Sequence, residues 1–459
     1  MLRPTGEAGT ASALTMLIGA SRGRRPPAAR AASARPAGGY IGQTDVVSER
    51  DVLVVGAGPS GAACAYWLAE AGNDVLLVEK KRFPREKTCG DGLTPRAVKQ
   101  LDDMGLGGAL AEHGHRFAGL RSIAFGRVLE LEWPEMPGFP RHGYVITRHD
   151  LDQLVAERAE KAGVELWEGA EATAPILDAG LVRGATVKRS GALEPVRARY
   201  VVIADGANSR FGRSLGTACD RSYPQGMAIR GYYSSPRHDE PWIESHLDVR
   251  DRHGNVLPGY GWIFPVGDGR VNVGVGLLST FNQWKEVNTS RLMDAFVQWA
   301  PESWGLSAET SCGPPVGGRL PMGFSVTPNV GPTWLVVGDA SGAINPFNGE
   351  GIAYAYETGR YAAEALDGAL RTGDGMALHQ YEQRVHDEYD LYYRVARAFV
   401  KIIGRPELMR VLVGTGMRSR PLMEWVLRIM ANLLRPDEIG PAEAAYRAVA
   451  AIARLAPAA

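Results

Sequence analysis

The chain has 459 residues, of which 45% are hydrophobic and 22% charged, so it predicts a globular protein of one large or two to three ordinary domains. Lys and Arg balance Asp and Glu at 51 each, and this zero net charge argues against a nucleic-acid partner held by counterion release. The four cysteines form no Cys-x-x-Cys pair, which argues against an iron–sulfur cluster or structural zinc and suits a reducing cytoplasm. No apolar run reaches the roughly 18 residues of a membrane-spanning helix.

Residues 1–50 differ from the rest of the chain. They are rich in Arg, Ala and Pro and show no apolar period. We expect a disordered tail, or a true start codon further along the sequence. A targeting peptide is the alternative, because an arginine-rich, acid-poor composition is typical of transit peptides.

Residues 51–80 hold the motif around which the chain is organised. They predict a strand, a glycine turn, a helix and a second buried strand: Asp51–Val55, Gly56-Ala57-Gly58, Ala62–Ala71 and Asp74–Val78. Three glycines stand at G-x-G-x-x-G spacing, and an acid ends the second strand. This context predicts a dinucleotide-binding βαβ unit. A coincidental glycine turn in another βαβ unit is the alternative.

Each position in this unit has a physical role. Gly56 allows the sharp turn, Gly58 lets a pyrophosphate approach the backbone, and Gly61 lets helix and strand pack closely. The phosphates would meet the positive end of the helix, where Ser60 lies. A carboxylate at Glu79 suits a ribose 2′-hydroxyl. We expect Lys80, which follows it, to belong to the same cofactor-binding set.

A loop and a new helix follow the βαβ unit. Gly90 and Gly92 mark the loop, and Thr94-Pro95 starts the helix. The spacing Pro84-x-x-x-x-Cys89-Gly90 resembles a loop of the geranylgeranyl reductase family of FAD-dependent flavoproteins, which lies beside the flavin there. The resemblance makes Gly90 a cofactor-binding candidate and Cys89 a catalytic one. The alternative for Cys89 is a small buried thiol that only packs.

The resemblance extends to further cofactor positions. In this flavoprotein superfamily the arginine that matches Arg148 contacts FAD, and the backbone that matches Ala172 meets the adenine. An ordinary surface arginine is the alternative for Arg148. The stretch YVVIADGANSR ends a predicted strand in Asp205-Gly206 and resembles the superfamily's Asp-Gly fingerprint, although such a pair also ends unrelated strands.

The stretch WLVVGDASGAINPFNGEGIAYAYETG resembles the second FAD fingerprint of the family. Its acid, Asp339, is implied to lie at the ribityl or pyrophosphate region. Gly351 and Ile352 open a helix whose N-terminus can face the O2 edge of the flavin and stabilise an anionic reduced flavin. We therefore expect the dinucleotide to be FAD rather than NAD.

Residues 218–330 alternate like the strands of an antiparallel sheet. Within them, Tyr260-Gly-Trp-Ile-Phe-Pro265 followed by Gly274 and Gly276 resembles the Y-x-W-x-F-P … G-x-G pattern of the same family. Aromatic residues on one strand face would build a flat apolar wall that suits a polyprenyl chain; core aromatics are the alternative. The substrate candidates are Tyr260, Trp262, Phe264 and Pro265, and Tyr260 and Trp262 are also catalytic candidates.

The predicted fold class is α/β. It has a Rossmann-like, hydroxylase-type FAD-binding domain (51–110, 143–217 and 331–370), an inserted antiparallel β-sheet substrate domain (111–142 and 218–330) and a helical C-terminal region (371–459). Residues 397–434 mix apolar residues with Arg and Lys. They are expected either to lie on a membrane surface or frame a lipid entrance, or to pack on the body with their basic residues in water.

The resemblance covers residues 51 to about 440 and is nearest to the bacterial menaquinone reductases. It implies reduction of an isoprenoid C=C bond, by hydride from N5 of reduced flavin and a proton, in the tail of menaquinone or in a geranylgeranyl chain. Cys89 and Tyr260 are the candidates for the proton donor or for a group that orients the donor. The electron donor stays open between NAD(P)H and a ferredoxin-like carrier, and no metal is expected. The protein is expected in the cytoplasm or peripherally at the inner face of the cell membrane.

Other functions remain open for the same fold. They are a flavin-dependent aromatic monooxygenase or halogenase, a flavin electron carrier to the quinone pool, and a non-catalytic lipid-binding protein. The halogenase motif W-x-W-x-I-P differs from this chain at Tyr260 and Phe264. The absence of an iron–sulfur cysteine set weakens the electron-carrier interpretation.

Overall fold

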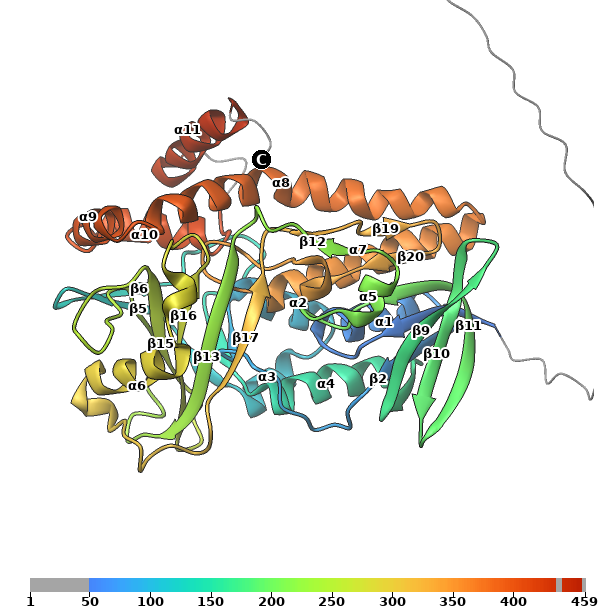
Figure 1. Ribbon diagram of the computed structural model, residues 1–459, viewed down its shortest axis with the longest axis horizontal. Helices are drawn as coiled ribbons and strands as arrows, with labels where there is room; N and C mark the ends of the chain where they lie inside the picture. Colours follow the sequence, from blue (N-terminus) through green and yellow to red (C-terminus); the bar gives the residue numbers. More distant parts are fainter. Residues whose placement is uncertain (1–48, 435–439, 456–459) are drawn as a thin grey trace, which may run out of the picture. The chain divides into compact units, whose positions relative to one another are not determined.

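The computed structural model describes residues 49–434 and 440–455. All but the last two residues of the predicted tail therefore lie outside the described part. Two large sheets and a set of helices make up the body (Figure 1). The boundaries of the two predicted domains remain a prediction.

The first sheet has the predicted nucleotide-binding topology. Its strands lie in the order β19-β20-β11-β1-β2-β8. The five from β20 to β8 run parallel. Their bounds are β1 Arg50–Val55, β2 Val75–Glu79, β8 Glu165–Glu168, β11 Ala192–Ile203 and β20 Trp334–Val336, and β19 (Val330–Gly331) pairs antiparallel at the edge. β9 (Ala170–Asp178) and β10 (Leu181–Arg189) extend β11 as an antiparallel meander.

Side chains alternate between the two faces of the parallel sheet. Val52 and Val54 join the core shared with the helices, whereas Leu53 and Val55 join the core under β9–β11. Both faces are dry, as expected for a parallel strand that is apolar along its whole length.

One helical layer covers the first face. α1 (Pro59–Glu70) packs between α4 (Arg148–Lys161) and α7 (Ile352–Thr372), and α8 (His379–Ile403) packs on α7. α1 begins three residues before the predicted Ala62, because Pro59 occupies the first helical position, where its missing N–H costs nothing.

The second sheet has the order β17-β13-β16-β15-β14-β5-β6. It combines strands from both segments of the predicted substrate domain: β5 Gly119–Ala124, β6 Arg127–Glu132, β13 Gln225–Ser234, β14 Trp242–His246, β15 Gly259–Pro265, β16 Arg270–Leu278 and β17 Val316–Pro321. All pairs are antiparallel except β14 and β5, which run parallel where the two segments meet. α6 (Thr289–Trp299) buries Leu292, Met293 and Phe296 against β16.

Smaller elements complete the structure. β3 (Gly92–Leu93), β7 (Gly143–Val145) and β4 (His115–Phe117) form a three-stranded sheet, and β12 (Ala218–Cys219) pairs with β18 (Val326–Thr327). The remaining helices are α2 Pro95–Asp103, α3 Gly107–His113, α5 Arg210–Ser214, α9 Pro406–Gly416, α10 Arg420–Met430 and α11 Pro441–Leu455, with 3-10 turns at Trp284–Glu286, Glu302–Trp304, Gly338–Ser341 and Gly375–Leu378. Within residues 49–434 and 440–455, no helix is both long and apolar enough to cross a membrane.

Candidate flavin and substrate site

The glycine turn between β1 and α1 is packed from the inside and open on the outside. A Cβ atom on Gly56 (φ +101°) would lie 2.5 Å from the carbonyl oxygen of Ala204, and one on Gly61 would lie 1.9 Å from that of Gly56. A Cβ on Gly58 would have nothing within 4 Å. Gly56 and Gly61 are therefore fixed by the protein's own packing, whereas Gly58 leaves space for a ligand, as the motif predicts.

The start of α1 meets the second fingerprint. α1 has no side-chain cap, so the N–H groups of its first turn remain available to a phosphate. The side chain of Ser60 is buried against Gly338, where a Cβ would lie 2.4 Å from Ser60 Oγ. Asp339 is the residue after Gly338, and its carboxylate forms an ion pair with Lys87 at 3.2 Å.

Glu79 is held at the end of β2 by the backbone. Its two carboxylate oxygens accept hydrogen bonds from Ala57 N–H (3.1 Å) and Lys81 N–H (3.0 Å). A carboxylate has about four lone-pair sites, so a ribose hydroxyl can still be bound. The side chain of Lys80 is exposed and makes no hydrogen bond or ion pair in the described part of the chain.

Arg148 belongs to a buried charge network and is not a surface arginine. Its guanidinium makes a bidentate pair with Asp152 at 2.6 and 2.7 Å. Arg85 donates to the same Asp152 at 2.8 Å and to Glu79 at 3.3 Å. The network therefore joins the predicted FAD-binding arginine to the predicted ribose-binding acid.

The remaining cofactor candidates lie around this core. Ala172 is on β9, which follows β8 in the chain. β8 is the strand that pairs with β2 beside Glu79. Gly351 caps α7 without a side-chain hydrogen bond, and Ile352 is the first residue of that helix. A Cβ on Gly351 would lie 3.2 Å from Asp339 Oδ1. An open Gly58, two uncapped helix N-termini and an anchored acid together fit FAD.

The loop with Cys89 is attached to the second sheet by Asn272. The amide of Asn272 donates to the carbonyl of Cys89 (3.0 Å) and to Asp91 Oδ2 (2.7 Å). Its amide oxygen accepts from the indole N–H of Trp262 at 2.9 Å. The phenol of Tyr232 also donates to Asp91. This network fixes the loop over β15, the strand of the predicted aromatic wall.

The aromatic wall exists and lies under that loop. The ring centroids of Tyr260 and Trp262 are 5.7 Å apart, and those of Trp262 and Phe264 are 6.3 Å apart. A Cβ on Gly90 or Gly92 would lie 3.3 or 3.1 Å from the ring of Phe264. Pro265 follows Phe264 on β15, so it lies on the opposite face of the strand.

Tyr260 connects the wall to the turn before α7. Its hydroxyl donates to the carbonyl oxygen of Asn348 at 2.7 Å. The structure therefore brings together Cys89, Gly90, Tyr260, Trp262 and the start of α7, which are spread over more than 250 residues of the sequence.

Two acids in this region hold protons more tightly than usual. Burial raises the pKa of Asp91 to about 6, against hydrogen bonds from Tyr232 and Asn272 that lower it. Burial raises the pKa of Glu350 to about 7, although the hydroxyl of Thr94 donates to its Oε1. Glu350 Oε2 is buried and has no hydrogen-bond partner within the described residues. Burial also raises the pKa of the Tyr260 phenol, which makes it a weaker acid.

The sequence did not point to several members of this site, namely Asp91, Tyr232, Asn272, Asn348 and Glu350. Asp91 carries the one local signal, because it stands between two glycines and adopts a positive φ of +64°, which Asp tolerates better than most residues. Glu350 lies inside the Gly-Glu-Gly turn that opens α7, but only its burial identifies it as an unusual acid.

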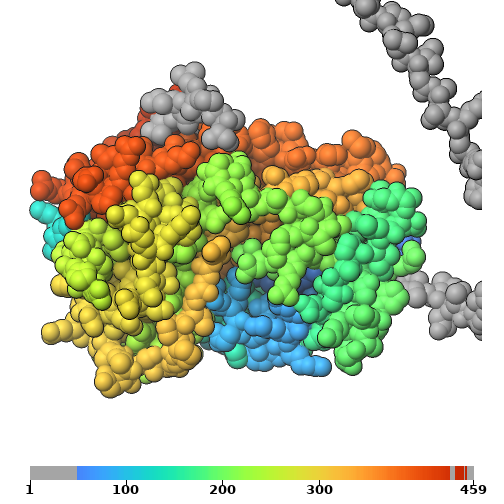
Figure 2. Space-filling view, viewed as in Figure 1, coloured from blue at the N-terminus to red at the C-terminus, as the bar shows by residue number. Residues whose placement is uncertain are grey.

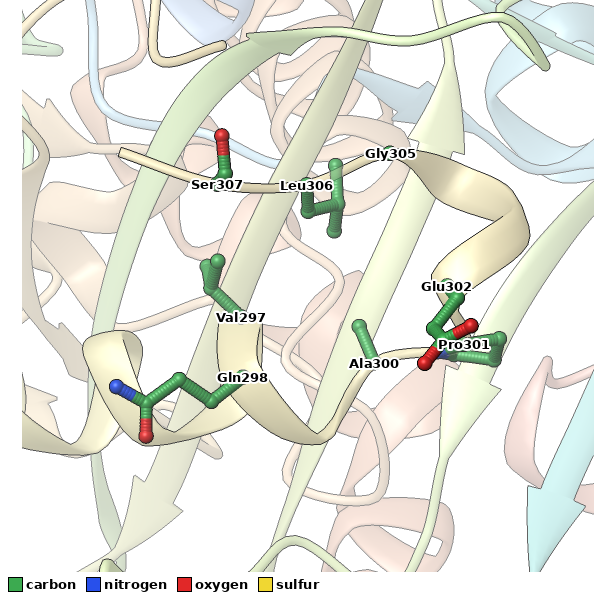
Figure 3. Close-up of a pocket in the computed structure, with 8 residues that line it drawn as sticks. All are labelled: Val297, Gln298, Ala300, Pro301, Glu302, Gly305, Leu306 and Ser307. Carbon is green, nitrogen blue, oxygen red and sulfur yellow. The ribbon is translucent and has the colours of Figure 1, made fainter. Parts of the chain in front are cut away.

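A separate pocket lies at the end of α6 (Figure 3). Its lining residues are Val297, Gln298, Ala300, Pro301, Glu302, Gly305, Leu306 and Ser307. None of them belongs to the candidate flavin and substrate site.

Comparisons with known proteins identify the relatives of this chain. An FAD binding domain family matches residues 49–235. The chain is 41% identical over 388 residues to a menaquinone reductase of Mycobacterium tuberculosis, which covers 84% of this chain and 92% of that protein. It is 32% identical over 372 residues to digeranylgeranylglycerophospholipid reductase 1 of Methanopyrus kandleri, with 79% and 93% covered.

Solved structures confirm the fold. A geranylgeranyl bacteriochlorophyll reductase-like protein of Thermoplasma acidophilum matches with a TM-score of 0.71 at 23% identity, over 87% of this chain and 99% of that one. The flavin-dependent brominase Bmp2 matches with a TM-score of 0.69 at 21% identity, over 89% and 100%. Both confirm the predicted hydroxylase-type FAD fold with a helical C-terminus.

The cofactor is FAD, as predicted, and the identity to curated reductases over most of their length shows the family. The chain belongs to the geranylgeranyl reductase family of FAD-dependent oxidoreductases.

Proposed function

We propose that this protein reduces a C=C bond in an isoprenoid chain, and that its substrate is the side chain of a menaquinone, of which it saturates one isoprene unit. The observation that carries the proposal is the 41% identity to a protein named menaquinone reductase over 92% of that protein's length. The geranylgeranyl chain of a lipid is the second candidate, because a digeranylgeranylglycerophospholipid reductase is 32% identical.

The residues around the aromatic wall support this chemistry. An isolated trisubstituted alkene has no carbonyl to stabilise developing charge, so its reaction depends on close positioning and exclusion of water. Tyr260, Trp262 and Phe264 offer an apolar surface for the chain, and the hydrogen bonds of Tyr260 and Trp262 fix their rings. Reduced FAD supplies the hydride when it is bound.

The second carbon of the alkene needs a proton, and we assign this role to Cys89. Of the two candidate donors, the Tyr260 phenol already donates to the carbonyl of Asn348, and burial weakens it as an acid. Cys89 lies in the loop over Trp262 and Phe264 and is only partly buried. Asn272 binds its backbone carbonyl and not its thiol. Tyr260 and Trp262 then act as positioning residues.

The test uses purified protein with its FAD, reduced by dithionite without oxygen. Menaquinone with a fully unsaturated tail, or a lipid with geranylgeranyl chains, is added in separate reactions, and products are measured by mass spectrometry. After air has returned the quinone ring to its oxidised form, we expect menaquinone to carry two added hydrogens in its isoprenoid tail, with the flavin reoxidised during the reaction. Reduction of the geranylgeranyl lipid alone would reassign the substrate.

Monooxygenase and halogenase activities are outcomes of the same experiment. If neither lipid changes, while NAD(P)H and oxygen convert an aromatic compound to a hydroxylated product, the reductase proposal is wrong. The brominase resemblance does not favour this outcome, because at 21% identity it shows the fold alone.

A further inference from the structure

Exposed apolar side chains gather at one end of the described structure. Of the eleven large hydrophobic side chains there that are exposed, six come from two segments of the chain. One segment is the turn between β5 and β6 with the first two residues of β6, and the other runs from the end of α8 into α9. The six are Phe125, Val128, Ile402, Leu408, Val411 and Leu412.

α9 presents one of its two apolar faces to solvent. Leu408, Val411 and Leu412 stand at positions i, i+3 and i+4, so they form one stripe, and Val411 is 65% exposed. The opposite face is inside, where Met409 is buried and Val413 packs against the core. Packing on the body therefore explains only the inner face of the helix.

The two segments are neighbours. Phe125 of the β5–β6 turn and Arg127, the first residue of β6, line one shallow groove together with Arg410 and Gly414 of α9 and with Arg418. Figure 1 shows α9 at the same end of the molecule as β5 and β6, and Figure 2 shows the two segments next to each other on the surface. We call this area, made of residues 125–128 and 402–418, the α9 surface.

The α9 surface is basic although the chain is neutral. Its residues include four arginines, Arg127, Arg405, Arg410 and Arg418, and one acid, Glu407. Three of these arginines, Arg127, Arg410 and Arg418, make no ion pair or side-chain hydrogen bond anywhere in the described chain. Uncompensated positive charge beside exposed apolar side chains is complementary to an anionic lipid surface.

The inner side of the same surface leads to the aromatic wall. Met417, Met423 and Leu427 belong to one buried cluster, and the partly buried Val413 and Phe264 both pack against it. An apolar connection therefore runs from α9 to the residues proposed to hold the prenyl chain. This step rests on the proposed function, whereas the exposure and charge of the α9 surface do not.

We propose that the α9 surface docks this protein on a membrane that carries anionic lipids. Leu408, Val411 and Leu412 enter the interface between head groups and acyl chains, and Arg127, Arg410 and Arg418 contact the phosphates. A lipid-borne prenyl chain would then reach the protein without passing through water.

The test measures co-sedimentation of the full-length, FAD-loaded protein with vesicles. One set contains phosphatidylcholine alone, and the other is an equal mixture of phosphatidylcholine and phosphatidylglycerol. We expect binding to the anionic vesicles, and we expect Val411→Ser/Leu412→Ser and Arg410→Glu/Arg418→Glu each to raise the lipid concentration for half-binding by about tenfold or more.

Matched controls lie on the β9–β11 meander. Leu177 and Leu193 are 61% and 64% exposed, against 65% and 46% for Val411 and Leu412, so Leu177→Ser/Leu193→Ser removes at least as much apolar surface elsewhere. Lys188→Glu/Arg197→Glu reverses two exposed charges there. Both controls should bind vesicles like the unchanged protein, and all four variants should keep their flavin absorbance and melting temperature.

Three results would overturn the proposal: no binding of the unchanged protein to anionic vesicles, equal binding by the α9 variants, or equal binding to neutral vesicles. A change in oligomeric state in Val411→Ser/Leu412→Ser with unchanged vesicle binding would assign the surface to a second copy of the chain. The vesicles contain no quinone, so failure of docking is distinguishable from failure of the proposed reductase activity, which is measured with detergent-dispersed substrate.

Discussion

Asn272 holds the Cys89 loop and the aromatic wall together through three side-chain hydrogen bonds. Asn272→Ala would leave the buried carboxyl of Asp91 and the indole N–H of Trp262 without this partner. We expect the free energy of unfolding to fall by about 2–4 kcal/mol, because unsatisfied buried polar groups are costly. Urea unfolding checks this, with the exposed Asn282→Ala as control. Equal stability of the two variants would contradict the role of Asn272.

The buried acid Glu350 should make stability depend on pH. The pKa of Glu350 is about 7 in the folded protein, against the ordinary value of 4.5 that applies to the unfolded chain. Between these two pH values the folded protein therefore keeps a proton that the unfolded chain has lost. The stability from this carboxyl is therefore complete below pH 4.5 and is lost as the pH rises through 7.

Glu350→Gln should remove this carboxyl's contribution to the pH dependence of stability. Relative to the unchanged protein, the variant should gain on the order of 3 kcal/mol of stability between about pH 4.5 and about pH 7, by the usual conversion of pKa shifts. Urea unfolding at both pH values measures the difference, and the exposed Glu302→Gln serves as control. A parallel pH dependence in the unchanged protein and Glu350→Gln would show that the carboxyl is not protonated in the fold.

Cys89 is the residue on which the proposed proton transfer depends. A positioned general acid contributes about 10²–10⁴ in rate, so Cys89→Ala should lower turnover by roughly that factor while FAD content stays unchanged. Cys89→Ser, which keeps a protic group, should recover part of the rate. Full activity of Cys89→Ala would show that the thiol only packs and does not donate the proton.

Within the β1–α1 turn, we expect one glycine to be required for folding and another for FAD binding. Gly61→Ala places a Cβ against the carbonyl of Gly56 and should destabilise the protein by about 3 kcal/mol or prevent folding. Gly58→Ala meets nothing within 4 Å, so it should fold normally yet bind FAD at least about tenfold more weakly. Melting curves and FAD titration of the apoprotein measure both effects. Normal FAD affinity in Gly58→Ala would place the pyrophosphate elsewhere.

The elements that could be predicted from sequence are those with a local signal. The βαβ unit, the aromatic strand and the start of α7 each carry their pattern within a few residues. The Asp91–Tyr232–Asn272 network could not be predicted, because its members come from a loop and two strands that only the fold brings together. The parallel pairing of β5 with β14 was missed for the same reason.

The C-terminal helices show the same limit. Composition predicted a mixed apolar and basic region over 397–434, but it could not tell which helix faces inward. The structure buries Met423 and Leu427 of α10 and leaves Leu408, Val411 and Leu412 of α9 in solvent. Of these two sets of side chains, we expect the exposed one on α9 to contact a membrane.

For the whole molecule, the fold is shared with flavoproteins of different chemistry, so it does not select a reaction. We infer that the residues at the junction of the two sheets determine which reaction is catalysed. There the FAD fingerprints of the first sheet face an aromatic strand of the second, and the Cys89 loop lies between them. We propose that this junction reduces an isoprenoid double bond.

The most direct test is a single-turnover reaction without oxygen. Reduced, FAD-loaded protein is mixed with excess menaquinone while flavin absorbance and product mass are followed together. We predict that each flavin reoxidised yields one molecule with two added hydrogens in its isoprenoid tail, and that Cys89→Ala slows both signals equally. Flavin reoxidation that reduces only the quinone ring, with the tail unchanged, would show that the protein transfers electrons to the quinone and does not reduce its isoprenoid tail.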